Sequence, residues 1–201
     1  MNHALKIAKS DIVLFLDDDI ELTSEIVKEH ALTYTNHAAD VVAGQVIQPW
    51  QESLPKNAVP FKNGNINDPD AFLFNSSQRS RIHRFMGGNF SIRKDVALEV
   101  GGFDENFIKV AYRFEAEFAD RLLTSGHSIL FLPDASIRHL KAESGGTRTY
   151  GEHLNNLGPA HSVGRYYYLL IANDVRDRFS RLLGGPIRAV MTRYHLTHPW
   201  W

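Results

Sequence analysis

Residues 12–22, with the sequence IVLFLDDDIEL, place three consecutive aspartates directly after a continuous apolar run. Such a run is typical of a β-strand buried on both faces, and therefore of a central strand in a parallel or mixed sheet. Three adjacent carboxylates repel one another, so Asp17, Asp18 and Asp19 lie either exposed in a loop or around a bound cation. Side chains two residues apart in an extended segment point the same way, so Asp17 and Asp19 can share one Mg²⁺ or Mn²⁺.

Strands alternate with helices along most of the chain, which indicates an α/β fold. We predict strands at 12–16, 40–48 and 128–133, and helices at 2–9, from Thr23 or Ser24 to about residue 37, and at 113–125. Residues 49–80 hold four prolines and many Asn, Asp and Ser, and they predict a long irregular loop. After residue 150 the pattern is helical, with a break expected at Gly184-Gly185-Pro186. The predicted domains are therefore 1–150, an α/β domain, and 151–201, a C-terminal helical extension.

Composition excludes several classes of protein. A net charge of −1 over 201 residues argues against a nucleic-acid binder, which normally carries a strong basic excess. The chain has no cysteine, which excludes disulfides, thiolate metal sites and cysteine nucleophiles and is typical of a reducing cytosol. The first residues, MNHALKIAKSD, lack the apolar region of a secretory signal, and no apolar stretch is long enough to span a membrane. We expect a cytoplasmic protein that at most lies peripherally on the inner face of the cell membrane.

Further segments of the chain hold candidate functional residues. Paired glycines precede polar residues in FMGGNFSIRKD (85–95) and in GGFDENF (101–107), where they permit either a close approach to a ligand or a tight turn. Glu115 and Glu117 open the helix of YRFEAEFADRL (112–122); the helix dipole alone favours carboxylates there, and one in a cleft can also act as a general base. His139 follows a strand and offers either a metal ligand or a structural hydrogen bond. Arg148 ends a glycine-containing segment suited to a diphosphate, or simply a surface loop.

Taken together and in this order, these segments resemble a family 2 glycosyltransferase of the GT-A type. The resemblance covers residues 2–148 and is carried by LFLDDDI (14–20), MGGNFSIRKDVALEVGGFDENF (86–107), FEAEFADRLLTSGHSI (114–129) and LPDASIRH (132–139). It implies a GT-A-like, Rossmann-like mixed sheet flanked by helices. The first residues are similar to the family's helix before its DxD strand, with Met1 where the family has Arg. This implies an N-terminally truncated domain that lacks the family's first nucleotide-binding strands.

The resemblance also implies an activity. It is the transfer of a sugar, with inversion, from a nucleotide-diphosphate sugar to a hydroxyl of a saccharide or lipid-linked acceptor, with Mn²⁺ or Mg²⁺ as cofactor. In place of the family's Glu-Asp pair this chain has Phe114-Glu115, so the general base would be Glu115, with Glu117 as its rival. The implied roles are metal binding for Asp17, Asp19 and His139; donor binding for Asp17, Asp18, Asp19, Gly87, Gly88, Asn89 and Arg148; and an acceptor-side position for Asp104, Glu105 and Glu117.

Several alternatives stay open. The chain is either an active transferase or a truncated, inactive fragment that only binds a ligand or partner. LFLDDDIEL also resembles the DxDx(T/V) strand of haloacid dehalogenase-type phosphatases, although Glu21 replaces the Thr or Val and no later Lys and paired-Asp motif follows. The C-terminal helices are rich in arginine. They either lie on an anionic membrane, or cap the sheet, or cover a partner subunit in a homodimer.

Overall fold

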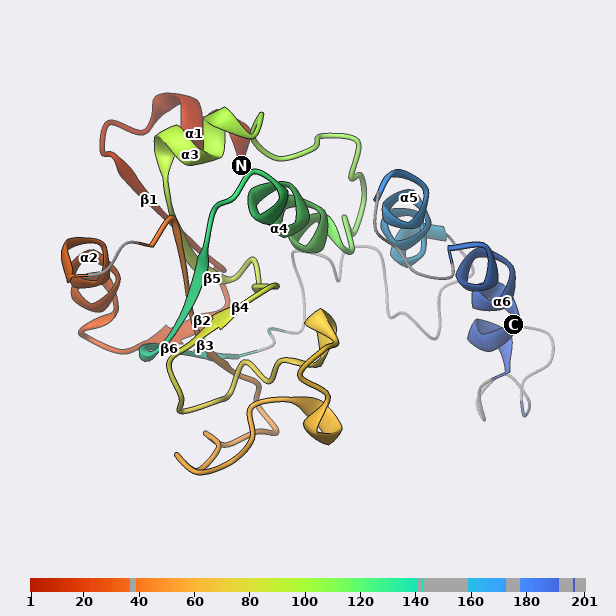
Figure 1. Cartoon of the computed structure of the whole chain (residues 1–201), viewed down its shortest axis with the longest axis horizontal. Coiled ribbons are helices and arrows are strands. Elements are labelled where there is room, and N and C mark those ends of the chain that lie inside the picture. Colours follow the sequence, from red (N-terminus) through yellow and green to blue (C-terminus); the bar gives the residue numbers. More distant parts are fainter. Residues whose placement is uncertain (37–38, 141, 143–158, 173–177, 192–196, 198–201) are drawn as a thin grey trace. The chain divides into compact units, whose positions relative to one another are not determined.

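The computed structural model describes residues 1–36, 39–140, 142, 159–172, 178–191 and 197 of the chain (Figure 1). The helices are α1 (Asn2–Ile7), α2 (Ile26–Asn36), α3 (Lys94–Glu99), α4 (Phe114–Thr124), α5 (Val163–Ile171) and α6 (Arg178–Val190). The strands are β1 (Ile12–Leu16), β2 (Ile20–Leu22), β3 (Val41–Ile47), β4 (Ser80–Ile82), β5 (Asn89–Arg93) and β6 (Ile129–His139). Short 3₁₀ turns lie at η1 (Lys62–Gly64), η2 (Pro69–Ala71) and η4 (Pro159–His161).

The six strands form one mixed sheet in the order β1-β5-β3-β6-β2, with β4 also paired to β6. The β3 and β6 strands are parallel, whereas β1 with β5, β5 with β3, and β2 and β4 with β6 are antiparallel. The β3 strand is buried along its whole length and has strands on both sides, which explains its apolar, β-branched sequence. The predicted mixed α/β sheet flanked by helices is confirmed.

Helices cover both faces of this sheet (Figure 1). On one face, Ile26 of α2 packs with Val42 and Val46 of β3 in a buried apolar cluster. On the other face the core is aromatic: Phe118 of α4 lies 4.2 Å, centroid to centroid, from Phe103, and edge-on contacts continue to the fully buried ring of Phe90 on β5. Burial of these large side chains stabilises the sheet on that face.

Three sequence-based expectations were wrong. Residues 12–16 do not form a central strand, because β1 lies at the edge of the sheet and, among the described strands, pairs with β5 alone. Its side chains are half-buried, and that of Leu16 is exposed. The last described helix does not break at its glycines; α6 runs through Gly184 and Gly185 with Pro186 inside it. The strand predicted at 128–133 does not end at Pro133 but continues to His139, because a bulge accommodates the proline and pairing resumes beyond it.

The chain divides into two compact units. Unit 1 comprises Met1–Phe103 and Phe118–Ala142 and contains the whole sheet, and unit 2 comprises Asp104–Glu117 and Glu143–Trp201. Within unit 2, the buried side chains of Phe107, Ala116 and Tyr168 form an apolar cluster that joins the segment before α4 to helix α5. The predicted boundary near residue 150 stays a prediction.

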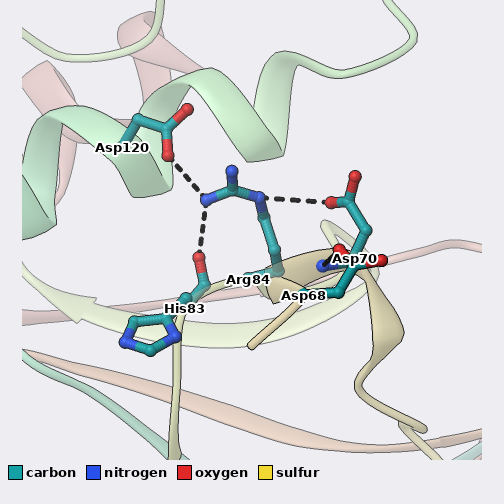
Figure 2. Close-up of polar contacts among 5 residues, drawn as sticks. All are labelled: Asp68, Asp70, His83, Arg84 and Asp120. Carbon is teal, nitrogen blue, oxygen red and sulfur yellow. Dashed lines mark hydrogen bonds and ion pairs between the residues drawn. The ribbon is translucent and has the colours of Figure 1, made fainter. Parts of the chain in front are cut away.

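Arg84 fastens the long 49–80 loop to α4 inside unit 1 (Figure 2). Its guanidinium pairs with Asp120 of α4 at 2.6 Å and with Asp70 of η2 at 3.3 Å, and it donates to the carbonyl of His83. Asp68 caps η2 by accepting a hydrogen bond from the Asp70 amide. The Arg84 side chain is only 12% exposed, so these charged hydrogen bonds satisfy a guanidinium that has little contact with water. Sequence reasoning did not identify this cluster.

Candidate functional site

Asp17, Asp19 and His139 converge at one end of the sheet. The Nε2 atom of His139 lies 3.7 Å from Oδ2 of Asp17 and 3.3 Å from Oδ1 of Asp19. Each residue offers one ligand atom, and these three atoms all lie within 4.8 Å of one another. The side chain of Asp17 is half exposed, whereas those of Asp19 and His139 are only 13% and 18% exposed. The cluster is therefore partly sheltered and open to solvent on the Asp17 side.

Backbone pairing brings these residues together from distant parts of the sequence. The β2 strand, which begins directly after Asp19, pairs with the end of β6 so that Ile20 lies opposite His139. The carbonyl of Asp19 accepts a hydrogen bond from the Leu140 amide at 2.8 Å, and its Oδ2 accepts one from the Ala142 amide at 3.0 Å. Asp19 is thus held through both backbone and side chain, while its Oδ1 faces His139.

The donor set fits a hard or borderline divalent cation. Two carboxylate oxygens and one imidazole nitrogen suit Mn²⁺, and carboxylates with water and phosphate oxygens suit Mg²⁺. The Nε2 atom of His139 points at both carboxylates, as a ligand nitrogen would. The residues present are therefore compatible with the metal that the sequence predicted.

Gly88 makes room for the Asp17 carboxylate. A Cβ atom at this position would overlap with Oδ2 of Asp17, and the Gly88 carbonyl accepts a hydrogen bond from the Asp17 amide at 3.1 Å. The backbone at Gly88 thus packs directly against the cluster. The glycine pair that the sequence singled out touches the predicted metal site through its second member.

A buried polar network lies behind this glycine, centred on Asn89, which is 1% exposed. Its Nδ2 donates to the carbonyls of Gln45 and Ala135 at 3.0 and 2.9 Å, so its Oδ1 is left to accept from Nε2 of His30 at 3.1 Å. Nε2 of His30 therefore carries the proton, and its Nδ1 accepts from the Ser91 hydroxyl at 2.7 Å. Burial lowers the pKa of His30, consistent with a neutral ring.

Asn89 bridges the place where the β3–β6 ladder is interrupted. Gly44 pairs with Leu132, but the next residue, Gln45, pairs with Ser136, so three residues of β6 bulge out of register. The Asn89 amide supplies hydrogen bonds to both strands at this point, and a Cβ atom on Gly44 would overlap with it. The part of β6 beyond the bulge is the part that ends in His139.

These contacts give Asn89 a structural role that sequence reasoning missed. The side chain faces the protein interior in the structure. Its predicted contact with the sugar stays a prediction. His30 was also missed, although the sequence offered a signal: it lies four residues after the buried Ile26, on the inward side of α2. Asp18 is exposed between the two clustered aspartates, and Gly87 is half-buried, so their donor-binding roles also stay predictions.

Comparison with known proteins identifies the family. The model of glycosyl transferase family 2 matches residues 1–101, which is half of the chain and includes Asp17, Asp19 and Gly88. The chain belongs to glycosyl transferase family 2. The interpretation as a haloacid dehalogenase-type phosphatase is therefore wrong. No curated protein matches the chain.

Solved structures show the fold of this family member. The chain is similar to residues 1–349 of TarS from S. aureus, in complex with UDP-GlcNAc, with 16% identity and a TM-score of 0.56 over 89% of this chain and 48% of that one. It is also similar to the mannosyltransferase PcManGT from Pyrobaculum calidifontis, in complex with GDP-Man and Mn²⁺, with 15% identity and a TM-score of 0.51 over 99% and 49%. The chain thus has the GT-A glycosyltransferase fold and spans about half the length of these two structures (48% and 49%).

The remaining predicted residues of this glycosyltransferase-family chain lie in unit 2. Glu115 is half-buried in the first turn of α4, and Glu117, two residues later in the same turn, is 8% exposed. Asp104 accepts hydrogen bonds from the Tyr167 hydroxyl at 2.7 Å and from the amide of Asn106 at 2.9 Å. The bond to Asp104 raises the pKa of Tyr167. Glu105 is exposed, and Arg148 lies outside the described residues, so the assignments of all these residues stay predictions.

The backbone immediately before Glu115 is strained. Lys109, Ala111 and Arg113 all have positive φ, at 62°, 53° and 79°, although none of them is glycine. Non-glycine residues in this region cost roughly 1–3 kcal/mol each, and such residues concentrate at functional sites. Helix α5 packs against the same segment, because Gly164 lies so close to Tyr112 that a Cβ atom would overlap with its carbonyl. The extension therefore supports the segment that leads into α4.

Proposed function

We propose that this chain transfers a sugar from a nucleotide-diphosphate sugar to an acceptor hydroxyl, with inversion at the anomeric carbon. The observation that carries the proposal is the convergence of Asp17, Asp19 and His139, from two distant segments, on one partly sheltered point. Family membership supports the reaction class, and the cluster supports a cation-bound diphosphate as the leaving group.

Asp17, Asp19 and His139 would hold the cation, which is Mn²⁺ or Mg²⁺. When bound, such an ion neutralises charge on a diphosphate and so stabilises it as a leaving group. Asp19 is fixed in place by the amides of Leu140 and Ala142, whereas Asp17 is the more exposed ligand. Asp17 is therefore the side on which the donor diphosphate would enter. Asp18, Gly87 and Arg148 remain the proposed donor contacts on that side.

Glu115 is the proposed general base. In the reaction, the acceptor oxygen forms a bond to the anomeric carbon while the bond from that carbon to the diphosphate oxygen breaks. The acceptor proton passes to the Glu115 carboxylate, and the bonding electrons leave with the nucleoside diphosphate. Two observations support this choice over Glu117: Glu115 is the more exposed of the two, and it follows a strained segment. Asp104, Glu105 and Glu117 are proposed to lie on the acceptor side.

The first experiment tests the metal site without requiring turnover. Binding of Mn²⁺ is measured by calorimetry for the wild type, for Asp19→Asn and for His139→Gln. Removing a charged ligand or the ligand nitrogen should weaken binding about tenfold or more. Asp11→Asn changes an exposed aspartate at the opposite end of β1 and should leave Mn²⁺ binding unchanged. Equal affinity in all four proteins would reject the cluster as the metal site.

The second experiment tests the reaction. The protein is incubated with Mn²⁺ and a panel of sugar nucleotides that includes UDP-GlcNAc and GDP-Man, and release of nucleoside diphosphate is measured. Glu115→Gln should abolish turnover while leaving Mn²⁺ affinity unchanged, and Glu117→Gln should retain measurable turnover. Donor binding with no turnover for any sugar would favour the alternative of a binding fragment. If the protein neither binds any of these sugar nucleotides nor releases nucleoside diphosphate from one, the proposal is overturned.

A further inference from the structure

Helix α6 presents an apolar stripe to solvent. Leu183 and Ile187 of α6 and Met191, the residue directly after it, follow one another at intervals of four residues. The Met191 amide still donates to the Ile187 carbonyl at 3.0 Å, so the three side chains share one side of the helix. Their side chains are 74%, 58% and 66% exposed. Scattered exposed apolar residues are ordinary on a protein surface, but three in register along one helix form a continuous surface that a partner would normally cover.

The helix packs on its neighbour through its other side. Gly185 is buried, and a Cβ atom there would lie 3.1 Å from the hydroxyl of Tyr166 on α5. By the helical period, position 185 is on the opposite side of α6 from the stripe formed by Leu183, Ile187 and Met191. The small residue therefore makes the internal contact, while the large apolar residues face outward. This arrangement is the reverse of that in an ordinary helix on the surface of a globular protein.

The charge of this region selects the kind of partner. From residue 178 to residue 201 the sequence has four arginines, at 178, 181, 188 and 193, and no Asp or Glu. An apolar stripe with a purely cationic remainder is typical of helices that lie in the interface of an anionic membrane.

We propose that α6 binds an anionic lipid surface, with the stripe of Leu183, Ile187 and Met191 inserted at the level of the headgroups. A second copy of this chain is a poorer occupant, because its own residues 178–201 offer no carboxylate to pair with these arginines, whereas anionic headgroups carry the opposite charge. Among the described helices, none combines the length and apolar character needed to cross a membrane. The inference does not depend on the proposed sugar transfer.

The test is flotation of the full chain with vesicles. The wild type should float with vesicles of phosphatidylcholine and phosphatidylglycerol, and about tenfold less with phosphatidylcholine alone or at about 0.5 M salt, which screens the charges. The double variant Leu183→Ser/Ile187→Ser should lose about tenfold or more of the binding to anionic vesicles. Val59→Ser/Ile66→Ser is the matched control, because these side chains are 60% and 61% exposed but lie in the long loop of unit 1; it should bind like the wild type.

Circular dichroism of each variant establishes that it is folded, since the substituted side chains are exposed and should not support the core. Three outcomes overturn the proposal. The first is that the wild type does not float with anionic vesicles, and the second is that the two double variants bind these vesicles equally well. The third is that the Leu183→Ser/Ile187→Ser change abolishes a dimer seen by sedimentation while vesicle binding persists. In the last case the stripe joins two copies of the chain.

Discussion

Replacing Asn89 with Ala removes the amide that bridges the interrupted ladder between β3 and β6. Three buried groups then lose their partner: the carbonyls of Gln45 and Ala135, each bonded by Nδ2, and Nε2 of His30, bonded by Oδ1. The site is closed to solvent, since Asn89 is 1% and His30 is 2% exposed. Water therefore has poor access to the groups that the substitution leaves unpaired.

The expected loss follows from these three groups. A buried polar group left without a partner costs about 1–3 kcal/mol, and neighbouring losses are not additive. We expect the free energy of unfolding to fall by about 3 kcal/mol or more, a large part of the roughly 5–15 kcal/mol of a typical domain. Asn89→Asp should be no better, because a carboxylate would face the same two carbonyls and cannot donate to them.

Urea denaturation followed by circular dichroism measures this loss, and calorimetry measures Mn²⁺ affinity of the folded variant. Because the strand beyond the bulge carries His139, we expect Mn²⁺ to bind about tenfold more weakly, as when groups that orient metal ligands are removed. Asn65→Ala, at an exposed position in the long loop, is the control and should change neither quantity. A loss of stability below about 1 kcal/mol for Asn89→Ala would refute the bridging role.

Three more predictions concern single residues. Gly88→Ala should weaken Mn²⁺ binding about tenfold in calorimetry, because the added Cβ displaces the Asp17 carboxylate; unchanged affinity would contradict this packing. Burial lowers the pKa of His30 below 6.5, so at pH values between the two pKa values the unfolded state binds more protons than the folded state. The contribution of the neutral His30 to the free energy of unfolding is therefore fully present above about pH 6.5 and is lost as the pH falls through the pKa of the folded state. Denaturation at several pH values should show this slope, and His30→Asn should flatten it. Gly164→Ala should lower turnover while leaving Mn²⁺ affinity intact, because its Cβ would overlap with the Tyr112 carbonyl next to the proposed base; an equal loss of both would argue against it.

Local features of the sequence were enough to predict most of the individual elements and to single out the candidate metal ligands. The apolar run at 40–48 predicts β3, and Gly126, with φ of 86°, ends α4 as expected from a residue that tolerates this conformation. Such features depend on side-chain period and on backbone freedom within a few residues. Asp17, Asp19 and His139 were identified in this way, from a strand end and from a resemblance, and the structure brings all three together.

How these elements combine could not be predicted from local features and became visible in the folded chain. The edge position of β1, the continuation of β6 past Pro133 and the interior position of Asn89 all depend on pairing between segments 40 or more residues apart. The same holds for His30, whose partners lie 59 and 61 residues away. A hydrogen bond satisfied across the fold leaves no periodic trace in the sequence, so the network behind the metal cluster is visible only once the chain is folded.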